Sequence, residues 1–126
     1  MPQPIITDTL SLQAFLDLLK INEGIIIVKF GAEWCGPCKK IEQQVYAGFN
    51  QMPVNVQPII VDVDESFELY AFLKSKKMVK SIPTLLCYEK GNVSYVPKDV
   101  VVGANVDEIT AFFNECFDKA SDLLAE

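Results

Sequence analysis

Two cysteines separated by two residues, placed shortly after an apolar run, constrain this chain more than any other feature. The run extends from Ile25 to Phe30 and is interrupted only by Lys29. Because apolar residues do not alternate with polar ones, the run predicts a strand buried on both faces of a sheet. Cys35 and Cys38 then stand where a helix begins, and Gly-Pro between them suits a first helical turn. The sequence therefore places two thiols where a buried strand passes into a helix.

That position gives the two thiols different roles. A helix N-terminus offers unpaired N–H groups and a partial positive charge, and both stabilise a thiolate. The thiolate is the form of cysteine that attacks disulfides. We therefore predict that Cys35, at the turn, is the solvent-accessible nucleophile and that Cys38 is the sheltered resolving thiol. Cys35 would form a mixed disulfide with another protein, and Cys38 would then attack Cys35 and release the reduced partner.

The rest of the chain alternates helical and strand signals, which favours a single α/β domain over residues 1–126. The expected helices cover about 12–19, 35–49, 67–76 and 109–120. The expected strands are a short one at 5–6, the run at 25–30, one at 56–63, and a hairpin of 84–88 with 93–96 around a turn at 90–92, with pairing resuming at 100–102.

Several local signals define these helices. Ser11 is typical of the residue that caps a helix N-terminus, and Asn105 or Asp107 can cap the last helix. Gly24 suits a left-handed position after the first helix. One apolar stripe predicts the buried face of the last helix: Ile109, Phe112, Phe113, Cys116, Phe117 and Ala120.

Composition excludes several classes of function. Eleven basic residues against 17 acidic ones give a net charge of −6, so nucleic acid is not an expected partner. The chain has no histidine, which excludes Ser–His, Cys–His and His–metal chemistry from its own residues. No apolar segment reaches the length of a membrane span, and the start shows no signal-peptide pattern. We therefore expect a cytoplasmic protein that does not bind membranes.

The string at residues 32–39, AEWCGPCK, resembles the active-site segment of the thioredoxin family. The similarity continues at Ile82-Pro83-Thr84, at the hairpin of Gly91 and at Gly103-Ala104, and it covers about residues 8 to 118. It implies a thioredoxin fold, in which a central mixed β-sheet is flanked by helices on both faces. It also implies a cis peptide bond before Pro83, with that proline beside the two cysteines.

The resemblance also implies a substrate-docking surface and a direction of electron flow. The docking surface would consist of Trp34, Gly36, Pro37, Ile82, Pro83, Gly103 and Ala104. Gly-Pro between the cysteines, with no histidine there, is typical of the reducing branch of the family and predicts a protein-disulfide reductase. No dinucleotide fingerprint is present, so we expect no cofactor beyond the cysteine pair and a separate thioredoxin reductase-like protein as electron donor. A protein-binding module and a more oxidising oxidase or isomerase remain as alternatives.

Lys29 is the main departure from the family, which usually carries a buried Asp at this strand position. In one interpretation its amine approaches Cys38 from below, stabilises that thiolate and makes the couple more oxidising. In the other, which we favour because a buried unpaired ammonium is costly, Lys29 reaches the surface with its stem packed on the sheet. Gln43 also replaces a common proline, so we expect a straighter active-site helix.

Cys87 and Cys116 are expected to be core residues, because a buried free cysteine behaves as a small apolar side chain. Regulatory oxidation and a disulfide-linked dimer are the alternatives. Four cysteines could in principle hold zinc. The absence of a second Cys-x-x-Cys and of histidine argues against any metal site.

Overall fold

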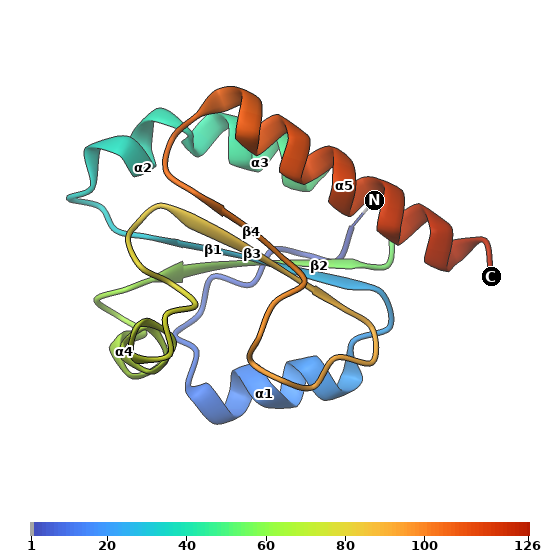
Figure 1. The fold of residues 1–126 in the computed structure, drawn as a ribbon, viewed down its shortest axis with the longest axis horizontal. Coiled ribbons are helices and arrows are strands. Elements are labelled where there is room, and N and C mark those ends of the chain that lie inside the picture. Colours follow the sequence, from blue (N-terminus) through green and yellow to red (C-terminus); the bar gives the residue numbers. More distant parts are fainter. Residues whose placement is uncertain (1) are drawn as a thin grey trace.

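A four-stranded mixed sheet with helices on both faces forms the centre of the computed structural model, which describes residues 2–126 (Figure 1). The elements follow in the order α1 (Leu12–Ile21), β1 (Ile25–Gly31), α2 (Gly36–Lys40), α3 (Glu42–Asn50), β2 (Val56–Asp62), α4 (Phe67–Ser75), β3 (Thr84–Glu89), β4 (Asp99–Val102) and α5 (Val106–Leu124). The strand order is β2-β1-β3-β4, with β1 parallel to β2 and antiparallel to β3. The fold class predicted from the sequence is confirmed.

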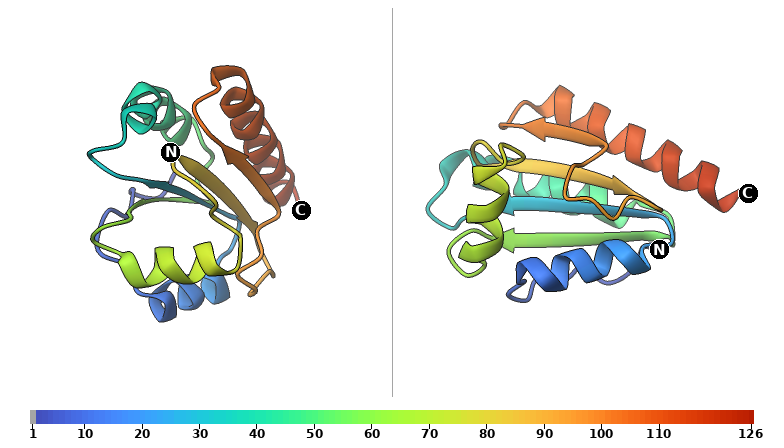
Figure 2. Two further views of the ribbon diagram at one scale, coloured as in Figure 1. Left: turned by 60° about the vertical axis from the view of Figure 1, so that its left-hand side comes forward. Right: turned by 60° about the horizontal axis from the view of Figure 1, so that its bottom comes forward.

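Strand β1 lies inside the sheet, and its side chains contribute to two hydrophobic cores, one on each face. Helices α2, α3 and α5 cover one face, and α1 and α4 cover the other (Figure 2). Ile25 and Ile27 join the core beneath α3 and α5, whereas Ile26 and Val28 join the core beneath α1 and α4. Because successive side chains of a strand point to opposite faces, Lys29 falls on the α2–α3–α5 side.

The N-cap predicted at Ser11 is confirmed, and of the two candidates for the last helix, Asn105 and Asp107, Asn105 is the cap. Ser11 Oγ accepts a hydrogen bond from the Ala14 N–H at 3.0 Å, and Asn105 Oδ1 accepts one from the Glu108 N–H at 2.9 Å. The strand expected at residues 5–6 is reduced to a single bridge between Ile6 and Ile59. Within residues 2–126, no helix combines the length and apolarity needed to cross a membrane.

The prediction that residues 93–96 form the second strand of a hairpin is wrong. These residues form an irregular loop, and the strand that pairs with β3 is β4. Asn92 and Ser94 satisfy the loop backbone locally: Asn92 Nδ2 donates to the Val96 carbonyl at 2.8 Å, and Ser94 Oγ accepts from the Val96 N–H at 3.1 Å. Such side-chain bonds compete with strand pairing, so pairing begins only at Asp99, opposite Cys87.

Gly24 does not take the predicted left-handed conformation. The glycines with positive φ among residues 2–126 are Gly91 and Gly103, and α1 ends instead at Asn22 in an extended conformation. A side chain at Gly24 would overlap the carbonyl oxygen of Asn55. The glycine is therefore needed for a close approach of two backbone segments and not for its torsion angles.

The active-site helix is not straight, contrary to the expectation from Gln43. It is interrupted at Ile41, whose φ of −103° and ψ of 1° lie outside the helical range, and this residue separates α2 from α3. The Ile41 side chain is buried in the core beneath the helices. A proline is therefore not required for a break here.

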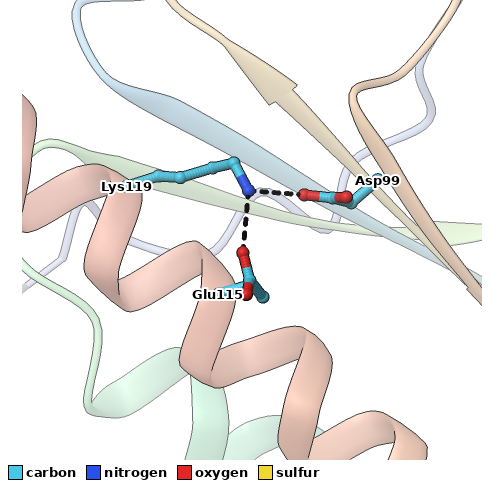
Figure 3. A network of polar contacts seen from close by, with 3 residues as sticks. All are labelled: Asp99, Glu115 and Lys119. Carbon is cyan, nitrogen blue, oxygen red and sulfur yellow. Dashed lines mark hydrogen bonds and ion pairs between the residues drawn. The ribbon is translucent and has the colours of Figure 1, made fainter.

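Helix α5 is anchored to the edge strand by a network of charges (Figure 3). Lys119 Nζ contacts Asp99 Oδ2 of β4 at 2.9 Å and Glu115 Oε2 at 3.1 Å. The hydrogen bond that Lys119 donates to Asp99 is the largest of the effects that raise the pKa of Lys119, and the bond that it donates to Glu115 adds to it. Phe117, which the apolar stripe placed in the core, is 42% exposed, so that prediction is wrong.

Candidate active site

Cys35 and Cys38 are joined by a disulfide at the N-terminus of α2, with their Cα atoms 5.3 Å apart. Cys35 is the N-cap residue of this helix, and its Sγ accepts a hydrogen bond from the Cys38 N–H at 3.2 Å. The Cys35 N–H in turn donates to the Ala32 carbonyl at 3.2 Å, which fixes the turn after β1. The helix N-terminus therefore points an N–H group at the first sulfur, where negative charge develops when the disulfide is reduced.

The accessibility predicted for Cys35 is not seen in this disulfide state. Cys35 is 5% exposed and Cys38 is 2% exposed, so the two sulfurs differ little in burial. The disulfide holds Cys35 Sγ toward the first turn of the helix, where it accepts the Cys38 N–H. The neighbouring Trp34 and Pro37 are exposed, so the segment itself lies at the surface.

Strand register brings the second predicted segment to the same edge of the sheet. Thr84 pairs with Phe30, so Pro83 lies beside the end of β1, from which the cysteine turn departs. The Ile82–Pro83 peptide bond is cis. Pro83 is buried and Ile82 is partly buried, so neither presents a fully exposed side chain.

Gly103 and Ala104 reach this edge from β4. The Gly103 N–H donates to the Pro83 carbonyl at 2.9 Å, and Gly103 has a φ of +91° that favours glycine. Both residues are partly buried. The structure therefore gathers the predicted segments at 34–38, 82–83 and 103–104 at one edge of the sheet.

Sequence reasoning missed a partner of Trp34. The Trp34 side chain is 68% exposed, yet its indole N–H donates to Asp64 Oδ2 at 2.8 Å. Asp62 Oδ1 accepts the N–H groups of Asp64 at 2.8 Å and Glu65 at 3.2 Å and so shapes the loop. Because β1 and β2 are parallel, their carboxyl ends bring the two loops together. A sequence pattern that predicts two parallel strands could therefore have indicated that their following loops lie close together.

Lys29 does not reach the surface, so the interpretation that we favoured from the sequence is wrong. The residue is 9% exposed. Its neighbours across the strands are Ile60 on β2 and Leu85 on β3, both apolar. Burial lowers the pKa of Lys29, and the nearby Glu42 carboxylate opposes part of that shift. The amine end lies beside Gly31, on the side of Cys38.

A pocket of about 170 Å³, partly open to solvent, lies beside Cys38 and the side chain of Lys29. The residues that line it are Lys29, Gly31, Ala32, Glu33, Cys38, Lys39, Glu42, Ile60, Val61 and Asp62. The volume is enough for several water molecules, and the charged walls offer them partners. Within residues 2–126, no three Cys, Asp or Glu side chains are arranged to hold a metal ion.

Comparison with known proteins places this site in a family. The sequence model of the family described as Thioredoxin matches residues 6–115. The chain belongs to the thioredoxin family. It is 36% identical to Thioredoxin 1 of Plasmodium falciparum over 93 residues, which are 74% of this chain and 81% of that protein. It is 34% identical to Thioredoxin 3 of the same organism over 96 residues, 75% of this chain, and spans about half (50%) of that longer protein.

Solved structures agree with the sequence comparison. The structure of Trichomonas vaginalis thioredoxin superposes with a TM-score of 0.72 at 30% identity, covering 89% of this chain and 96% of that one. Thioredoxin-family membership and the Cys35–Cys38 disulfide together make this protein a thiol–disulfide oxidoreductase. The two thiols that the sequence singled out are the pair that the fold joins.

Proposed function

We propose that this thioredoxin-family protein is a protein-disulfide reductase, in which Cys35 is the nucleophile and Cys38 the resolving thiol. The observation that carries the proposal is the hydrogen bond from the Cys38 N–H to Cys35 Sγ at the helix N-terminus. It favours the thiolate at Cys35 in the reduced protein. No histidine is present to stabilise the reduced form further, and such stabilisation is what makes a disulfide more oxidising.

The proposed reaction consists of two thiol–disulfide exchange steps. The Cys35 thiolate attacks one sulfur of the substrate disulfide, forms a mixed disulfide and expels the other sulfur as a thiolate. Cys38, after losing its proton, attacks Cys35 Sγ and expels the second substrate sulfur. The substrate disulfide is reduced by two electrons, and the Cys35–Cys38 dithiol is oxidised to the disulfide.

The substrate is proposed to dock on the edge that surrounds the disulfide. Trp34, Gly36 and Pro37 are exposed there, and the segments of Ile82–Pro83 and Gly103–Ala104 lie at the same edge of the sheet. An extended substrate segment would use the backbone of these segments, since little of their side-chain surface is exposed. We further propose that the protein works in the cytoplasm, needs no cofactor beyond its cysteine pair, and is recharged by a separate thioredoxin reductase-like protein.

The direction of the reaction is tested by reduction of insulin with a small dithiol, in the presence and absence of the protein. We expect acceleration that is lost in Cys35→Ser and kept in Cys87→Ser, a matched change at a buried cysteine away from the site. Equal rates with Cys35→Ser and the unaltered protein would refute the proposal. Partner capture that persists when both site cysteines are replaced by Ser would favour a binding module instead.

The redox potential of the couple separates a reductase from an oxidase or isomerase. Thioredoxins have redox potentials of about −270 mV, and strongly oxidising relatives have potentials of about −120 mV. We expect a value closer to the first, measured by equilibration with glutathione buffers. The amine of Lys29, close to Cys38, and the hydrogen bond to Cys35 Sγ both favour a less negative value. A potential of about −120 mV would overturn the reductase assignment.

A further inference from the structure

Strand β4 is an edge strand, and within residues 2–126 no other strand pairs with its outer side (Figure 2). The Gly103 N–H donates to the Pro83 carbonyl, in register with the pairing of Val101 on β3. Antiparallel strands bond at alternate residues, so the N–H and C=O groups of Val100 and Val102 point away from the sheet. Their side chains are 47% and 43% exposed. This edge therefore has backbone groups that an added strand can bind.

On one face of the sheet, an open groove of about 400 Å³ lies between this edge and α5. Its charged lining residues are all acidic: Asp99, Glu108 and Glu115. Lys119 contacts Asp99 and Glu115 and so balances one of the three charges (Figure 3). Because Glu108 forms no ion pair with residues 2–126, the groove keeps a negative charge.

On the opposite face, a groove of about 340 Å³ lies between the same edge and the turn that follows α4. Met78, Val100 and Val102 contribute apolar surface to its lining. Both of its charged residues, Lys77 and Lys80, are basic. Neither lysine forms an ion pair with a residue of the described chain, 2–126. In a chain with a net charge of −6, this groove is a local positive region.

The backbone conformation at Lys77 sets this lysine apart from an ordinary surface residue. Its φ of +64° favours glycine. The Lys77 N–H donates to the Lys74 carbonyl at 3.0 Å and the Met78 N–H to the Leu73 carbonyl at 2.9 Å, which is the usual pattern of a helix that ends on glycine. The turn therefore does not account for a lysine here. Replacement by glycine would remove the charge without straining the backbone.

We propose that the outer edge of β4 binds an extended segment of a partner protein in which basic residues alternate with acidic or apolar ones. The backbone of that segment bonds to Val100 and Val102. Its side chains point alternately to the two faces, so the basic ones enter the acidic groove and the others enter the groove of Lys77 and Lys80. Charge complementarity then selects the partner. The inference does not rest on the proposed function, because neither groove is lined by one of the site cysteines.

A second copy of this chain is a poorer occupant of the edge. Two identical edge strands related by a twofold axis run antiparallel, and each face then adjoins the same face of the other copy. Glu108 and Glu115 of one copy would approach the same residues of the other, and the lysines on the opposite face would also meet. Like charges across an added strand are unfavourable. We therefore expect the free protein to be a monomer with an open edge.

The proposal is tested with a terminally blocked peptide, Lys-Glu-Lys-Val-Lys-Glu-Lys, added to the isotope-labelled full chain. A peptide of the same composition with its four lysines in one block is the control. Hydrogen exchange of single amides is followed by NMR. The alternating peptide should slow exchange at Val100 and Val102 by about tenfold, because their N–H groups gain acceptors. Val101 should change little, because its N–H already bonds to β3.

Three variants separate strand addition from a general charge contact. Val100→Pro removes an outward N–H without removing a bond to β3, and it should weaken binding about five- to tenfold. Val106→Pro, a matched change at the first position of α5, should leave binding unaltered. Lys77→Gly should weaken binding about two- to fivefold through the lost charge. Lys74→Gln, on α4 outside the groove, should not.

Several results would overturn the proposal. These are equal affinity for the two peptides, full binding by Val100→Pro, and equal slowing of exchange at Val101 and its two neighbours. A dimer in sedimentation of the free protein, with Val100 and Val102 already protected, would assign the edge to a second copy instead. The peptide contains no cysteine, so its binding is independent of insulin reduction. Loss of insulin reduction with intact peptide binding would refute the proposed function alone.

Discussion

Trp34 and Asp64 are joined by a hydrogen bond of 2.8 Å between two loops that follow neighbouring parallel strands. The bond holds a side chain that is 68% exposed next to the disulfide. An exposed aromatic side chain with a fixed orientation presents an apolar surface at low entropic cost. This relationship connects the β2 loop, which carries no reacting group, to the proposed docking surface.

Loss of the hydrogen bond between Trp34 and Asp64 should weaken substrate docking more than it slows the chemical steps. An exposed hydrogen bond contributes about 0.5–1 kcal/mol, so Asp64→Ala should raise KM for a protein disulfide about two- to fivefold with kcat unchanged. Asp64→Asn keeps an acceptor oxygen and should stay near the original value. Fluorescence of Trp34, the only tryptophan of the chain, reports the change in its surroundings independently. A lower kcat with an unchanged KM would contradict this role for Asp64.

The buried amine of Lys29 predicts a pH-dependent stability. Burial lowers its pKa in the folded protein below the value of 10.5 in the unfolded chain. Between the two values the unfolded chain binds more protons, so the free energy of unfolding contributed by this group rises with pH. At lower pH the folded state carries the full cost of the buried cation.

Lys29→Met should therefore stabilise the protein most at neutral and lower pH. The advantage should shrink as pH approaches 10.5, where the unaltered amine is neutral in the folded protein. Urea unfolding of both proteins at a series of pH values measures the difference. An advantage that stays constant or grows with rising pH would show that the amine is not buried as described.

Cys87 and Cys116 should resist modification in the folded protein. Both are fully buried, and the pKa of Cys116 is raised mainly by a hydrogen bond with Cys87 and further by burial. Cys116 therefore forms little thiolate, and reagents reach neither of the two buried sulfurs. After reduction, iodoacetamide should modify Cys35 alone under native conditions and all four cysteines in urea, as counted by mass spectrometry. Modification of Cys87 or Cys116 in the folded protein would contradict this prediction and would favour regulatory oxidation of these thiols.

Gly24 should tolerate no side chain. Because a Cβ there would overlap the Asn55 carbonyl oxygen, Gly24→Ala must displace backbone, and we expect a loss of about 2–3 kcal/mol in the free energy of unfolding. Gly36→Ala is the matched control, since the space around its Cβ is open, and it should change stability by less than about 0.5 kcal/mol. Similar losses for the two variants in urea unfolding would contradict the close approach at Gly24.

Local features were predictable because neighbouring residues decide them. Ser11 and Asn105 bond within their own first helical turns, so local sequence identified Ser11 as a cap and Asn105 as one of two candidates. The predictions that failed depended on contacts outside each local pattern. The side-chain hydrogen bonds of Asn92 and Ser94 hold residues 93–96 in a loop outside the sheet. The apolar stripe of α5 could not show that Phe117, at the margin of the buried face, is 42% exposed.

The position of the cysteine pair could be predicted from local sequence, because a buried strand, two thiols and a helix start are adjacent along the chain and need no distant partner. The position of the Lys29 amine could not be predicted in this way. A flexible side chain on a central strand can turn to either solvent or core, and helices α2 and α3, packed over that face of β1, enclose it beside Cys38. Packing between segments distant in sequence, and not local preference, sets the surroundings of the resolving sulfur.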